Sequence, residues 1–497
     1  MQGTRIHLMV GGLLLAAASS SVQAEALQPD PAWQQGTLAN GFSWQILDTP
    51  QRPSDRVELR LIVNTGSLVE SSQQIGFAHL LPRLAMARSE SFTPAQLCSL
   101  WQQGVDNDRP LPPAIGSYDF TMYNLSLPNN RPDLLKEALA WLSDTTGKLA
   151  IDEHTVRAVM NSSADPIGIF PPNPQDPWWR YRLKGSTLLA HDPGQPVKRP
   201  VNIEQLKKFY QQWYTPDVMT LYVVGKVDSR SLSEQINKAF SPLEGKRETP
   251  ATMPTLTPLP PQPVSLMSEA VKQDTLSIMW DTPWHPIRDS QNLSRYWRSD
   301  LAREALFWHL QQALEKSPQK DAKLGFDCRV QYQRAQCAIH LETPNANLNP
   351  GLEFVAGEMA NVRNNGLTQQ EFDSLLAQKT AQLSKLFATY ARTDTDVLMS
   401  QRLRSQQSGV VDIAPEQYQQ LRQAFLSTLT LESLNQELKL QLSQDATLVL
   451  LQPKGEPEVN MKQLQENYNR IMMPAPAVVT EEVKPVEGAA PTEAGAQ

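Results

Sequence analysis

The sequence is poor in three features that mark common classes of protein. It has 3 cysteines in 497 residues, which excludes a small scaffold held by a dense set of disulfides. Its formal net charge is −7 and it contains no run of basic residues, which argues against nucleic acid or an anionic membrane as the main partner. Beyond residue 24 no stretch is apolar and long enough for a membrane-spanning helix. We therefore expect a chain that neither binds nucleic acid nor spans a membrane.

Motifs for several kinds of catalysis are also missing. The chain has no GxSxG elbow, no glycine-rich phosphate loop and no CxxC pair. Its 7 histidines, at positions 7, 79, 154, 191, 285, 309 and 340, include no pair three or four residues apart. That spacing is the one that places two imidazoles on one helix face to share a metal ion. No self-contained catalytic motif is therefore present.

Residues 1–24 are typical of a secretory signal peptide. Arg5 precedes an apolar run from Leu8 to Ala18, and Val-Gln-Ala stands before Glu25 as a small-residue cleavage site. The run is too short to span a membrane as a stable helix. A buried N-terminal helix is the alternative interpretation. We expect cleavage after Ala24 and export, in a bacterium to the periplasm.

The first half of the chain combines strand and helix patterns. Alternating apolar residues over 42–46 and 57–63 predict a β-hairpin. Helices are predicted from Pro94 to Gln103 and from Asp133 to Leu142, where Leu134, Leu135, Ala138, Trp141 and Leu142 recur at helical spacing. An apolar run from Leu221 to Gly225 predicts a buried closing strand. These elements define an N-terminal domain over residues 25–248.

The second half repeats this plan after a proline-rich segment. Residues 249–264 contain six prolines, which cannot form a helix or a central strand and so predict an extended linker. A C-terminal domain over 265–473 follows, and residues 474–497 are rich in Ala, Pro, Glu and Val without an aromatic residue. Such a tail is expected to be disordered, either as an inert end or as an interaction segment.

The elements expected in the C-terminal domain follow the order of the first. They are a strand from Leu276 to Trp280, a helix from Ala302 to Leu314, a hairpin, two helical stretches and a closing strand from Thr447 to Leu451. Two similar halves of about 200 residues predict a duplicated fold.

The cysteines divide into a pair and a single residue. Alternation around Cys328 and Cys337, with a turn at Tyr332 and Gln333, places the two sulfurs opposite each other in a hairpin. Because an exported protein meets oxidant, we expect a disulfide between them, with two buried free thiols as the alternative. Cys98 lies in the helix predicted from Pro94 to Gln103, and we expect it to be a buried thiol.

The stretch from Gly76 to Leu84, which contains His79, carries the main family resemblance. With Asn40 and Gly41, then Gly66, Ser67 and Glu70 before it, it resembles the start of the pitrilysin (M16) family of zinc metallopeptidases. The family carries an HxxEH motif at this position, in which two histidines hold zinc and the Glu polarises the bound water. A lone His79 is expected to be a hydrogen-bonded core residue.

The other positions of the motif have changed. Pro82 stands where the family has Glu, and Arg83 stands where it has the second His. A proline in a helix interior costs about 3 kcal/mol, so we expect a shifted backbone there, and a guanidinium cannot ligate zinc. The resemblance places the third ligand, a Glu, at Ser162, with Asn161 and Ser163 as alternatives, and no Glu lies between Glu153 and Glu204. Arg83 is free to pair with a carboxylate such as Glu70.

A second signature follows at Ala114 to Tyr123. It resembles the family's Asn-Ala pair and Tyr-Asp-x-Thr-x-Tyr strand, a sheet edge to which active members add an extended substrate. Pro113 replaces the Asn, and proline removes a backbone donor, which weakens this edge as a template. The proline-rich stretch 166–177 is expected to be a packed irregular loop, with an exposed recognition loop as the alternative.

The second half offers a separate check on activity. Active members carry there an Arg and, seven residues later, a Tyr that hold the substrate carbonyl. The matching positions are Gln319 and Phe326, in the context Leu324-Gly325-Phe326. Both polar groups are therefore lost from the second part of the site.

The resemblance covers residues 36–455 and implies an α+β fold. Two similar domains, each an antiparallel-rich sheet packed with helices, are expected to form a clam-shaped chamber, as in the periplasmic two-domain bacterial members. We expect an inactive homologue without the zinc of active members, which binds a peptide or protein or serves as the non-catalytic partner of an intact M16 chain. A zinc endopeptidase with a rebuilt metal site and a remnant without a ligand are the alternatives.

Overall fold

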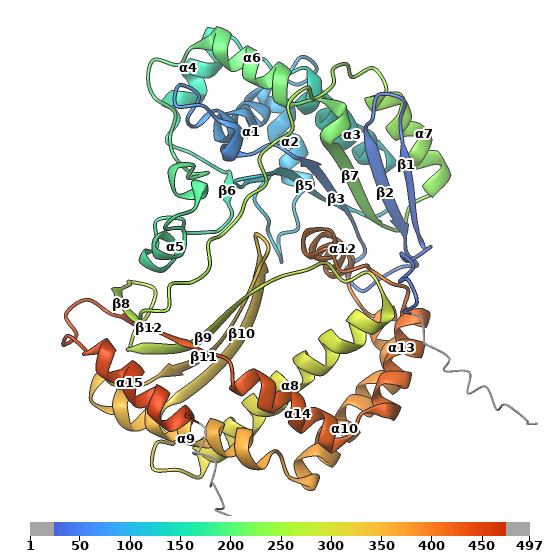
Figure 1. Cartoon of the computed structure of the whole chain (residues 1–497). Coiled ribbons are helices and arrows are strands. Elements are labelled where there is room, and N and C mark those ends of the chain that lie inside the picture. The colour runs from blue at the N-terminus through green and yellow to red at the C-terminus, as the bar shows by residue number, and fades with distance from the viewer. Residues whose placement is uncertain (1–23, 474–497) are drawn as a thin grey trace, which may run out of the picture.

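The computed structural model describes residues 24–473, which form two lobes, one above the other in Figure 1. The predictions for residues 1–23 of the signal peptide and for the tail 474–497 lie outside the described residues. Each lobe has a sheet with helices on its outer face, and each has its own large apolar core. This confirms the expected two-domain α+β architecture. No helix in the described part of the chain has the length and hydropathy to cross a membrane.

The first sheet has 7 strands in the order β1-β2-β7-β3-β5-β4-β6. Its strands are β1 (Trp33–Thr37), β2 (Ser43–Asp48), β3 (Arg56–Val63), β4 (Ala114–Gly116), β5 (Thr121–Pro128), β6 (Gly168–Ile169) and β7 (Met219–Gly225). The helices of this lobe are α1 (Phe77–Ala87), α2 (Pro94–Gln103), α3 (Pro132–Gly147), α4 (Glu153–Asn161), α5 (Pro177–Arg182), α6 (Ile203–Trp213) and α7 (Ser229–Phe240).

The second sheet has 5 strands in the order β10-β11-β9-β12-β8. Its strands are β8 (Val264–Met267), β9 (Thr275–Pro283), β10 (Lys323–Gln331), β11 (Arg334–Glu342) and β12 (Thr447–Gln452). Its helices are α8 (Ser290–Glu315), α9 (Leu348–Asn365), α10 (Gln369–Ser384), α11 (Leu386–Ala391), α12 (Thr395–Ser408), α13 (Pro415–Thr428), α14 (Leu431–Leu442) and α15 (Met461–Met472). The prediction of two helical stretches between the hairpin and the closing strand is therefore wrong, because six helices, α9 to α14, occupy that region.

The two sheets share one connection plan. The first sheet contains the order β2-β7-β3-β5-β4, and the second repeats it as β8-β12-β9-β11-β10. The pairing directions also match, since β2 and β7 are parallel and so are β8 and β12. The first sheet adds β1 at one edge and β6 at the other. The repeat inferred from the sequence is thus present in the topology.

One strand pairing differs from the prediction. The segments 42–46 and 57–63 do not form a hairpin, because β7 lies between β2 and β3. The partner of β2 in a hairpin is β1. Alternation shows which residues face the core but not which strand lies alongside. The sequence pattern therefore could not show that β7, which begins at residue 219, lies between β2 and β3.

Local sequence signals explain several helix ends. The Thr93 side chain accepts a hydrogen bond from the Gln96 backbone N–H, and the Gln96 side-chain oxygen accepts one from the Thr93 backbone N–H. This capping box starts α2. Helix α2 has the predicted bounds, but Cys98 is exposed rather than buried. The buried residues of α2 are Leu97 and Leu100, and Cys98 falls on the opposite side of the helix.

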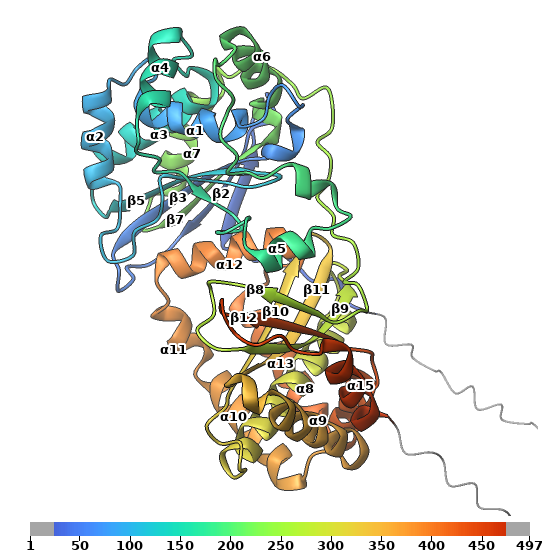
Figure 2. The same cartoon turned by 90° about the vertical axis from the view of Figure 1, so that its left-hand side faces the viewer.

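Helix α12 of the second domain covers the inner face of the first sheet. Its Leu398 and Met399 pack with Trp33, Leu47 and Tyr222 of that sheet. Both views show α12 between the two lobes (Figures 1 and 2). The space between the domains is therefore partly filled by the chain itself.

The proline-rich segment before β8 runs between the lobes without helix or strand up to residue 263. It is fastened along its length: the Ser186 hydroxyl donates to the Thr255 carbonyl over 2.7 Å, and the Thr257 hydroxyl donates to the Lys184 carbonyl over 2.9 Å. Leu256 and Leu259 are packed into two small apolar clusters. The segment is extended, and both domains hold it in place.

Candidate functional site

Helix α1 carries His79, and a buried carboxylate caps the start of the helix. The two oxygens of Glu70 accept hydrogen bonds from the backbone N–H groups of Gly76 and Ala78, over 2.8 and 3.0 Å. Burial raises the pKa of Glu70 from 4.5 to about 7, against the lowering effect of these two bonds. Glu70 is therefore committed to α1 and does not pair with Arg83, in contrast to the pairing considered from the sequence.

The helix continues through Pro82. Helix α1 runs without interruption from Phe77 to Ala87 with Pro82 inside it and buried, so the backbone shift expected there does not interrupt the helix. Proline lacks only the one N–H that would bond to the carbonyl four residues earlier. The backbone accommodates this loss, and His79 and Arg83 remain on one face, four residues apart.

His79 is held by a carboxylate that the sequence argument did not consider. Its Nε2 lies 2.7 Å from Oδ2 of Asp165, in the loop after α4. His79 is buried, and its Nδ1 has no hydrogen-bond partner among the described residues. The expected hydrogen-bonded core histidine is thus observed, with Asp165 as its partner.

Arg83 reaches the same loop. Its Nη2 donates to the carbonyl of Val159 over 2.9 Å and lies 3.5 Å from the carbonyls of Ser162 and Ala164. Its Nε lies 3.9 Å from Asp165. The guanidinium therefore closes the end of α4 and joins it to the loop that carries Asp165.

The structure groups the predicted positions His79, Pro82, Arg83 and Ser162 into one small region. Ser162 follows the last residue of α4 and its hydroxyl accepts a hydrogen bond from the Ala164 backbone N–H over 3.2 Å. Asn161, one of the alternatives, instead contacts Arg199 over 3.3 Å. None of the three residues at 161–163 has an acidic side chain that faces His79.

The residues at these positions do not fit a zinc ion. The family's donor set is two imidazoles and a carboxylate, whereas here one imidazole is hydrogen bonded to Asp165 and a guanidinium occupies the second position. Among the described residues no group of three or more His, Cys, Asp or Glu side chains has the geometry to hold a metal. A fixed cation beside the position also repels Zn²⁺.

The sheet edge of the second signature is occupied by the chain itself. Strand β6 pairs with β4 in parallel, with Ile115 opposite Gly168 and Gly116 opposite Ile169. The loop 166–177 thus contains a short strand and is neither wholly packed nor wholly exposed. Because β6 takes the outer hydrogen bonds of β4 at residues 115 and 116, an added peptide strand cannot pair with β4 there.

Gln319 and Phe326 lie apart from the His79 region. The Gln319 backbone N–H donates to the Ser317 hydroxyl over 3.1 Å in the turn before β10. The Phe326 ring stacks on Phe307 of α8, with centroids 6.0 Å apart, on the helix-covered face of the second sheet. Neither residue makes a hydrogen bond or aromatic contact with His79 or Arg83 in the described structure.

The hairpin of β10 and β11 ends in the first domain. Cys328 and Cys337 are opposite each other and form a disulfide with an S–S distance of 2.02 Å. Tyr332 and Gln333 turn the chain with positive φ angles of 48° and 65°, at the predicted place. The Tyr332 ring meets Tyr118 with centroids 5.9 Å apart, and burial raises the Tyr332 pKa well above its usual range.

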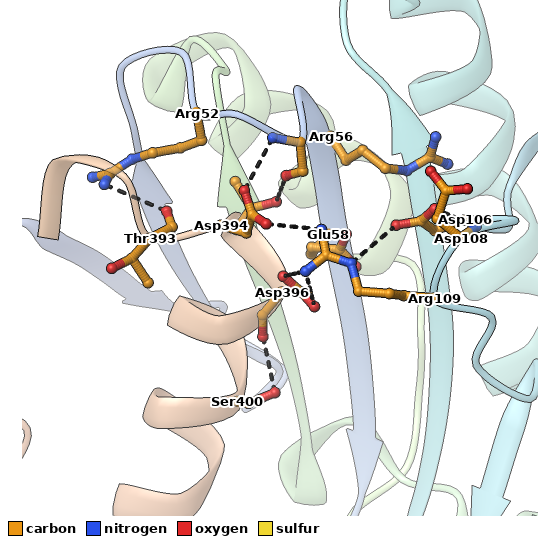
Figure 3. A network of polar contacts seen from close by, with 12 residues as sticks. Arg52, Arg56, Glu58, Asp106, Asp108, Arg109, Thr393, Asp394, Asp396 and Ser400 are labelled. Carbon is orange, nitrogen blue, oxygen red and sulfur yellow. Dashed lines mark hydrogen bonds and ion pairs between the residues drawn. The ribbon is translucent and has the colours of Figure 1, made fainter. Parts of the chain in front are cut away.

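Polar contacts on the opposite side also join the domains (Figure 3). Arg109 of the first domain contacts Asp396 over 3.0 Å and Asp394 over 2.9 Å at the start of α12. The other oxygen of Asp394 accepts from the Ser54 backbone N–H over 3.0 Å. Burial lowers the pKa of Arg109, but the nearby carboxylates together outweigh this effect and raise the pKa above its usual value. The start of α12 is therefore fastened to the first domain.

A buried charge cluster lies between the domains. Asp281 of β9 contacts Arg182 of α5 over 3.0 Å and Arg334 of β11 over 2.7 Å. The Arg182 guanidinium also donates to the Thr257 carbonyl over 2.6 Å, and Asp281 accepts from the Leu259 backbone N–H over 2.8 Å. Burial lowers the pKa of Arg182, and Arg334 lowers it further, against the raising effect of Asp281.

Sequence reasoning missed Asp165, Asp281 and their partners. Asp165 lies 86 residues after His79, and Arg182 and Asp281 lie 99 residues apart. A search for any carboxylate, and not only Glu, near the third-ligand position would have found Asp165. Nothing in the sequence signals the Asp281 cluster, because its members come from both domains.

Comparison with known proteins agrees with this architecture. A family model described as insulinase (peptidase family M16) matches residues 47–166, and one described as peptidase M16 inactive domain matches residues 200–379. The chain is 62% identical to Protein YhjJ of Escherichia coli K12 over 97% of each sequence. It is 22% identical to the probable zinc protease PqqL of E. coli, of which it spans 47%.

Solved structures give the same picture. The fold matches a structure described as a predicted insulinase family protease from Yersinia pestis, with a TM-score of 0.89 and 75% identity over 94% of this chain and 100% of that one. It also matches the first half of the periplasmic protease PqqL from E. coli, with a TM-score of 0.72 and 20% identity over 89% of this chain and 98% of that one. With two domain models, relatives over nearly the full length and the repeated sheet plan in agreement, the chain belongs to peptidase family M16.

Proposed function

We propose that this protein is a catalytically inactive M16 member that binds a peptide or protein. One observation carries the proposal: the residues at the motif positions are used to hold the chain's own loop. His79 and Arg83 both contact Asp165, and Arg83 also bonds to the Val159 carbonyl. Arg83 has no lone pair to give and the Nε2 of His79 bonds to Asp165, so the motif positions offer zinc at most the buried Nδ1 of His79. Pro82 supplies no base to activate water.

The occupied edge of β4 supports the same proposal. Active members need that edge to align a substrate, and here β6 fills it. The two replacements at Gln319 and Phe326 remove the polar groups that the resemblance assigns to substrate binding in the second domain. Loss at three separate places favours a chain that uses the fold for binding rather than for hydrolysis.

We further propose that the protein acts in the periplasm after signal cleavage. The support is the signal-like sequence at residues 1–24 and the match to PqqL, which is described as a periplasmic protease. Its partner is a peptide, or a catalytically intact M16 chain to which it is the non-catalytic companion.

The test combines metal content, cleavage and binding on the purified mature chain. We expect far less than one zinc per chain, no cleavage of an unstructured peptide, and saturable binding of that peptide. A His79→Ala variant is the matched control, since it removes the remaining imidazole and so reports background zinc and contaminating peptidase. Stoichiometric zinc with cleavage that a chelator abolishes, both lost in His79→Ala, would establish the rebuilt peptidase instead.

A second measurement separates the two kinds of partner. Cross-linking in the native exported compartment, followed by identification of bound chains, yields a chain with an intact HxxEH motif if the protein is a companion subunit. Recovery of peptides alone identifies a binding module. A chain that binds neither would be a remnant of the fold, and the proposal of a binding function would fail.

A further inference from the structure

A cavity of about 630 Å³ lies between the two domains. It is bordered by the loop that leads into α5, by the tip of the β10–β11 hairpin and by the C-terminal end of α12. Figure 2 shows α5 and α12 close to these strands between the lobes. This volume is within the range of sites that hold small ligands or short peptide segments.

The wall of the cavity carries more positive than negative charge. Four arginines line it, Arg182, Arg329, Arg334 and Arg404, whereas Asp176 is the one acidic lining residue. The Asp176 carboxylate is already engaged, since it accepts from the Trp178 backbone N–H over 2.9 Å and from the Ser268 hydroxyl over 3.3 Å. The lining therefore favours an anionic ligand.

The base of the cavity contains two guanidiniums for one carboxylate. The side chains of Arg182 and Asp281 are 2% and 4% exposed, and that of Arg334 is 13% exposed. All three nitrogens of Arg182 have partners: Gln336, the Thr257 carbonyl and Asp281. Arg334 uses Nε and Nη2 on Asp281 and its Nη1 has no partner in the described structure. The cluster therefore has one positive charge in excess, largely shielded from solvent.

Arg404 and Arg329 add two more donors. Arg404 is exposed on α12 and makes no ion pair or side-chain hydrogen bond with any described residue. Arg329 pairs with Asp327 over 3.2 Å, but its side chain is 72% exposed. A weak surface pair of this kind leaves the guanidinium free to turn towards a ligand.

The remaining wall suits a polypeptide rather than a small inorganic ion. Phe170, Pro171, Trp178 and Trp179 supply apolar surface. Strand β10, whose residues 329–331 line the cavity, is the last strand of its sheet and has no further strand on its outer side among the described residues. An extended peptide placed there finds free backbone groups beside apolar contacts and guanidiniums.

We infer that this cavity binds an acidic peptide in an extended conformation, with its carboxylates on Arg334, Arg404 and Arg329. The inference rests on the proposed binding function and specifies the class of ligand and its place. Binding occurs beside β10 in the second domain and not at the β4 edge, which β6 occupies. Selectivity for acidic sequences follows from the charge of the wall, since the backbone contacts do not depend on sequence.

The test uses the full mature chain and two fluorescent peptides of equal length. One peptide carries four glutamates, and the other has glutamine at the same places and an amidated C-terminus. Fluorescence anisotropy measures both affinities at low and high salt. The variant Arg329→Gln/Arg404→Gln is compared with Arg230→Gln, which changes an arginine whose side chain is 92% exposed and which does not line the cavity.

We expect the acidic peptide to bind more tightly than the neutral one, with affinity that falls as salt rises. The double variant should lose about ten-fold or more in affinity for the acidic peptide, because it removes two of the guanidiniums that bind the carboxylates, and Arg230→Gln should match the parent. Inorganic phosphate at equal ionic strength should compete no better than chloride.

Four outcomes would overturn the inference, and they separate its failure from a failure of the proposed function. Equal binding of both peptides would reject the acidic class while peptide binding stands. Specific competition by phosphate, with no preference between peptides, would assign a small-anion site. Unchanged affinity in a folded double variant would place the peptide elsewhere, and no binding of either peptide would count against the proposed function itself.

Discussion

Two charged regions of this protein differ in how their charges are balanced. Around the positions that match the family's metal ligands, His79 and Arg83 are matched by Asp165 and by backbone carbonyls of the same loop. In the interdomain cavity, Arg182 and Arg334 share the single carboxylate of Asp281, and Arg404 has no partner among the described residues. The charges of the first region are balanced internally, although the Nδ1 of His79 has no partner among the described residues, whereas the second region has charged donors left over.

This difference indicates that a ligand binds in the interdomain cavity and not at the His79 region. A closed network of contacts stabilises the fold and offers nothing to a ligand. An excess of donors beside an apolar wall is costly for the isolated chain and becomes favourable when an anion is bound. The predictions below alter one region or the other, from the largest expected effect to the smallest.

The largest effect is expected from Asp281→Asn, at the buried carboxylate that pairs with Arg182 and Arg334 of the cavity wall. The change leaves two guanidiniums without their counter-charge, so the free energy of unfolding should fall by about 3–5 kcal/mol. Urea unfolding followed by tryptophan fluorescence measures it. Asp133→Asn, at a carboxylate whose side chain is 67% exposed beside Arg131, is the control and should change little. Equal stability of Asp281→Asn and parent would show that the cluster is not electrostatically coupled.

The next effect concerns Glu70, which caps the helix of the first region. Its pKa is about 7 in the folded protein against an ordinary 4.5, so the folded state binds the extra proton between these values. The proton on Glu70 therefore adds to the free energy of unfolding in full below pH 4.5. This stabilisation, about 3 kcal/mol in all, is lost as the pH rises through 7.

Unfolding at several pH values tests this, with Glu70→Gln as the matched variant. Glutamine keeps an acceptor and cannot titrate, so the difference between parent and variant should change in favour of the variant as the pH rises from 4.5 to 7. If the difference in unfolding free energy were constant over this range, or changed in the opposite direction, burial would not be what sets the pKa of Glu70.

The third prediction concerns the disulfide of the β10–β11 hairpin, which carries Arg334 to the cavity. Replacing Cys328 and Cys337 together by Ser opens a loop of about ten residues and should lower the free energy of unfolding by about 2–3 kcal/mol. Intact mass should rise by two hydrogens on reduction. The single replacement Cys98→Ser, on the exposed face of α2, is the control and should have little effect. A mass insensitive to reductant would rule out the bridge.

The smallest effect is expected from Arg83→Gln in the first region. It removes the guanidinium bond to the Val159 carbonyl and the contact with Asp165, and should cost about 2 kcal/mol. Hydrogen exchange should report faster opening of the loop from residue 159 to β6. Arg157→Gln, at an exposed helix pair with Glu153, should leave that loop unchanged. If both variants behaved alike, Arg83 would have no special part in holding the loop.

Local sequence patterns predicted the helices, strands and turns better than they predicted which of these elements pack side by side. The helix α2 and the Tyr332–Gln333 turn are encoded within a few residues, and both lie where predicted. The burial of Cys98 was wrong although the helix was right, because the helix phase set by Leu97 and Leu100 turns it outwards. The hairpin of β2 and β3 was wrong because pairing with β7 depends on residues about 170 positions away in the chain.

The candidate site was likewise predictable only in part. Motif spacing located His79, Pro82 and Arg83, and helix α1 brings them together. The partner Asp165 and the cluster around Asp281 depend on how a loop closes and how two domains meet, which no local period records. The backbone shift expected at Pro82 does not interrupt α1, because the rest of the helix, capped by Glu70 and buried along most of its length, outweighs one missing bond.

The first described residues of the chain are joined to the second domain. The Leu27 backbone N–H donates to the Arg288 carbonyl over 2.9 Å, and that of Asp30 donates to the Asp412 carbonyl over 2.8 Å. Leu27 is part of the core of the second domain. During synthesis the N-terminus emerges first, so this segment waits for almost the whole chain before it finds its partners. A chain that ended before residue 288 would therefore leave Leu27 without its backbone partner and without the core into which it packs.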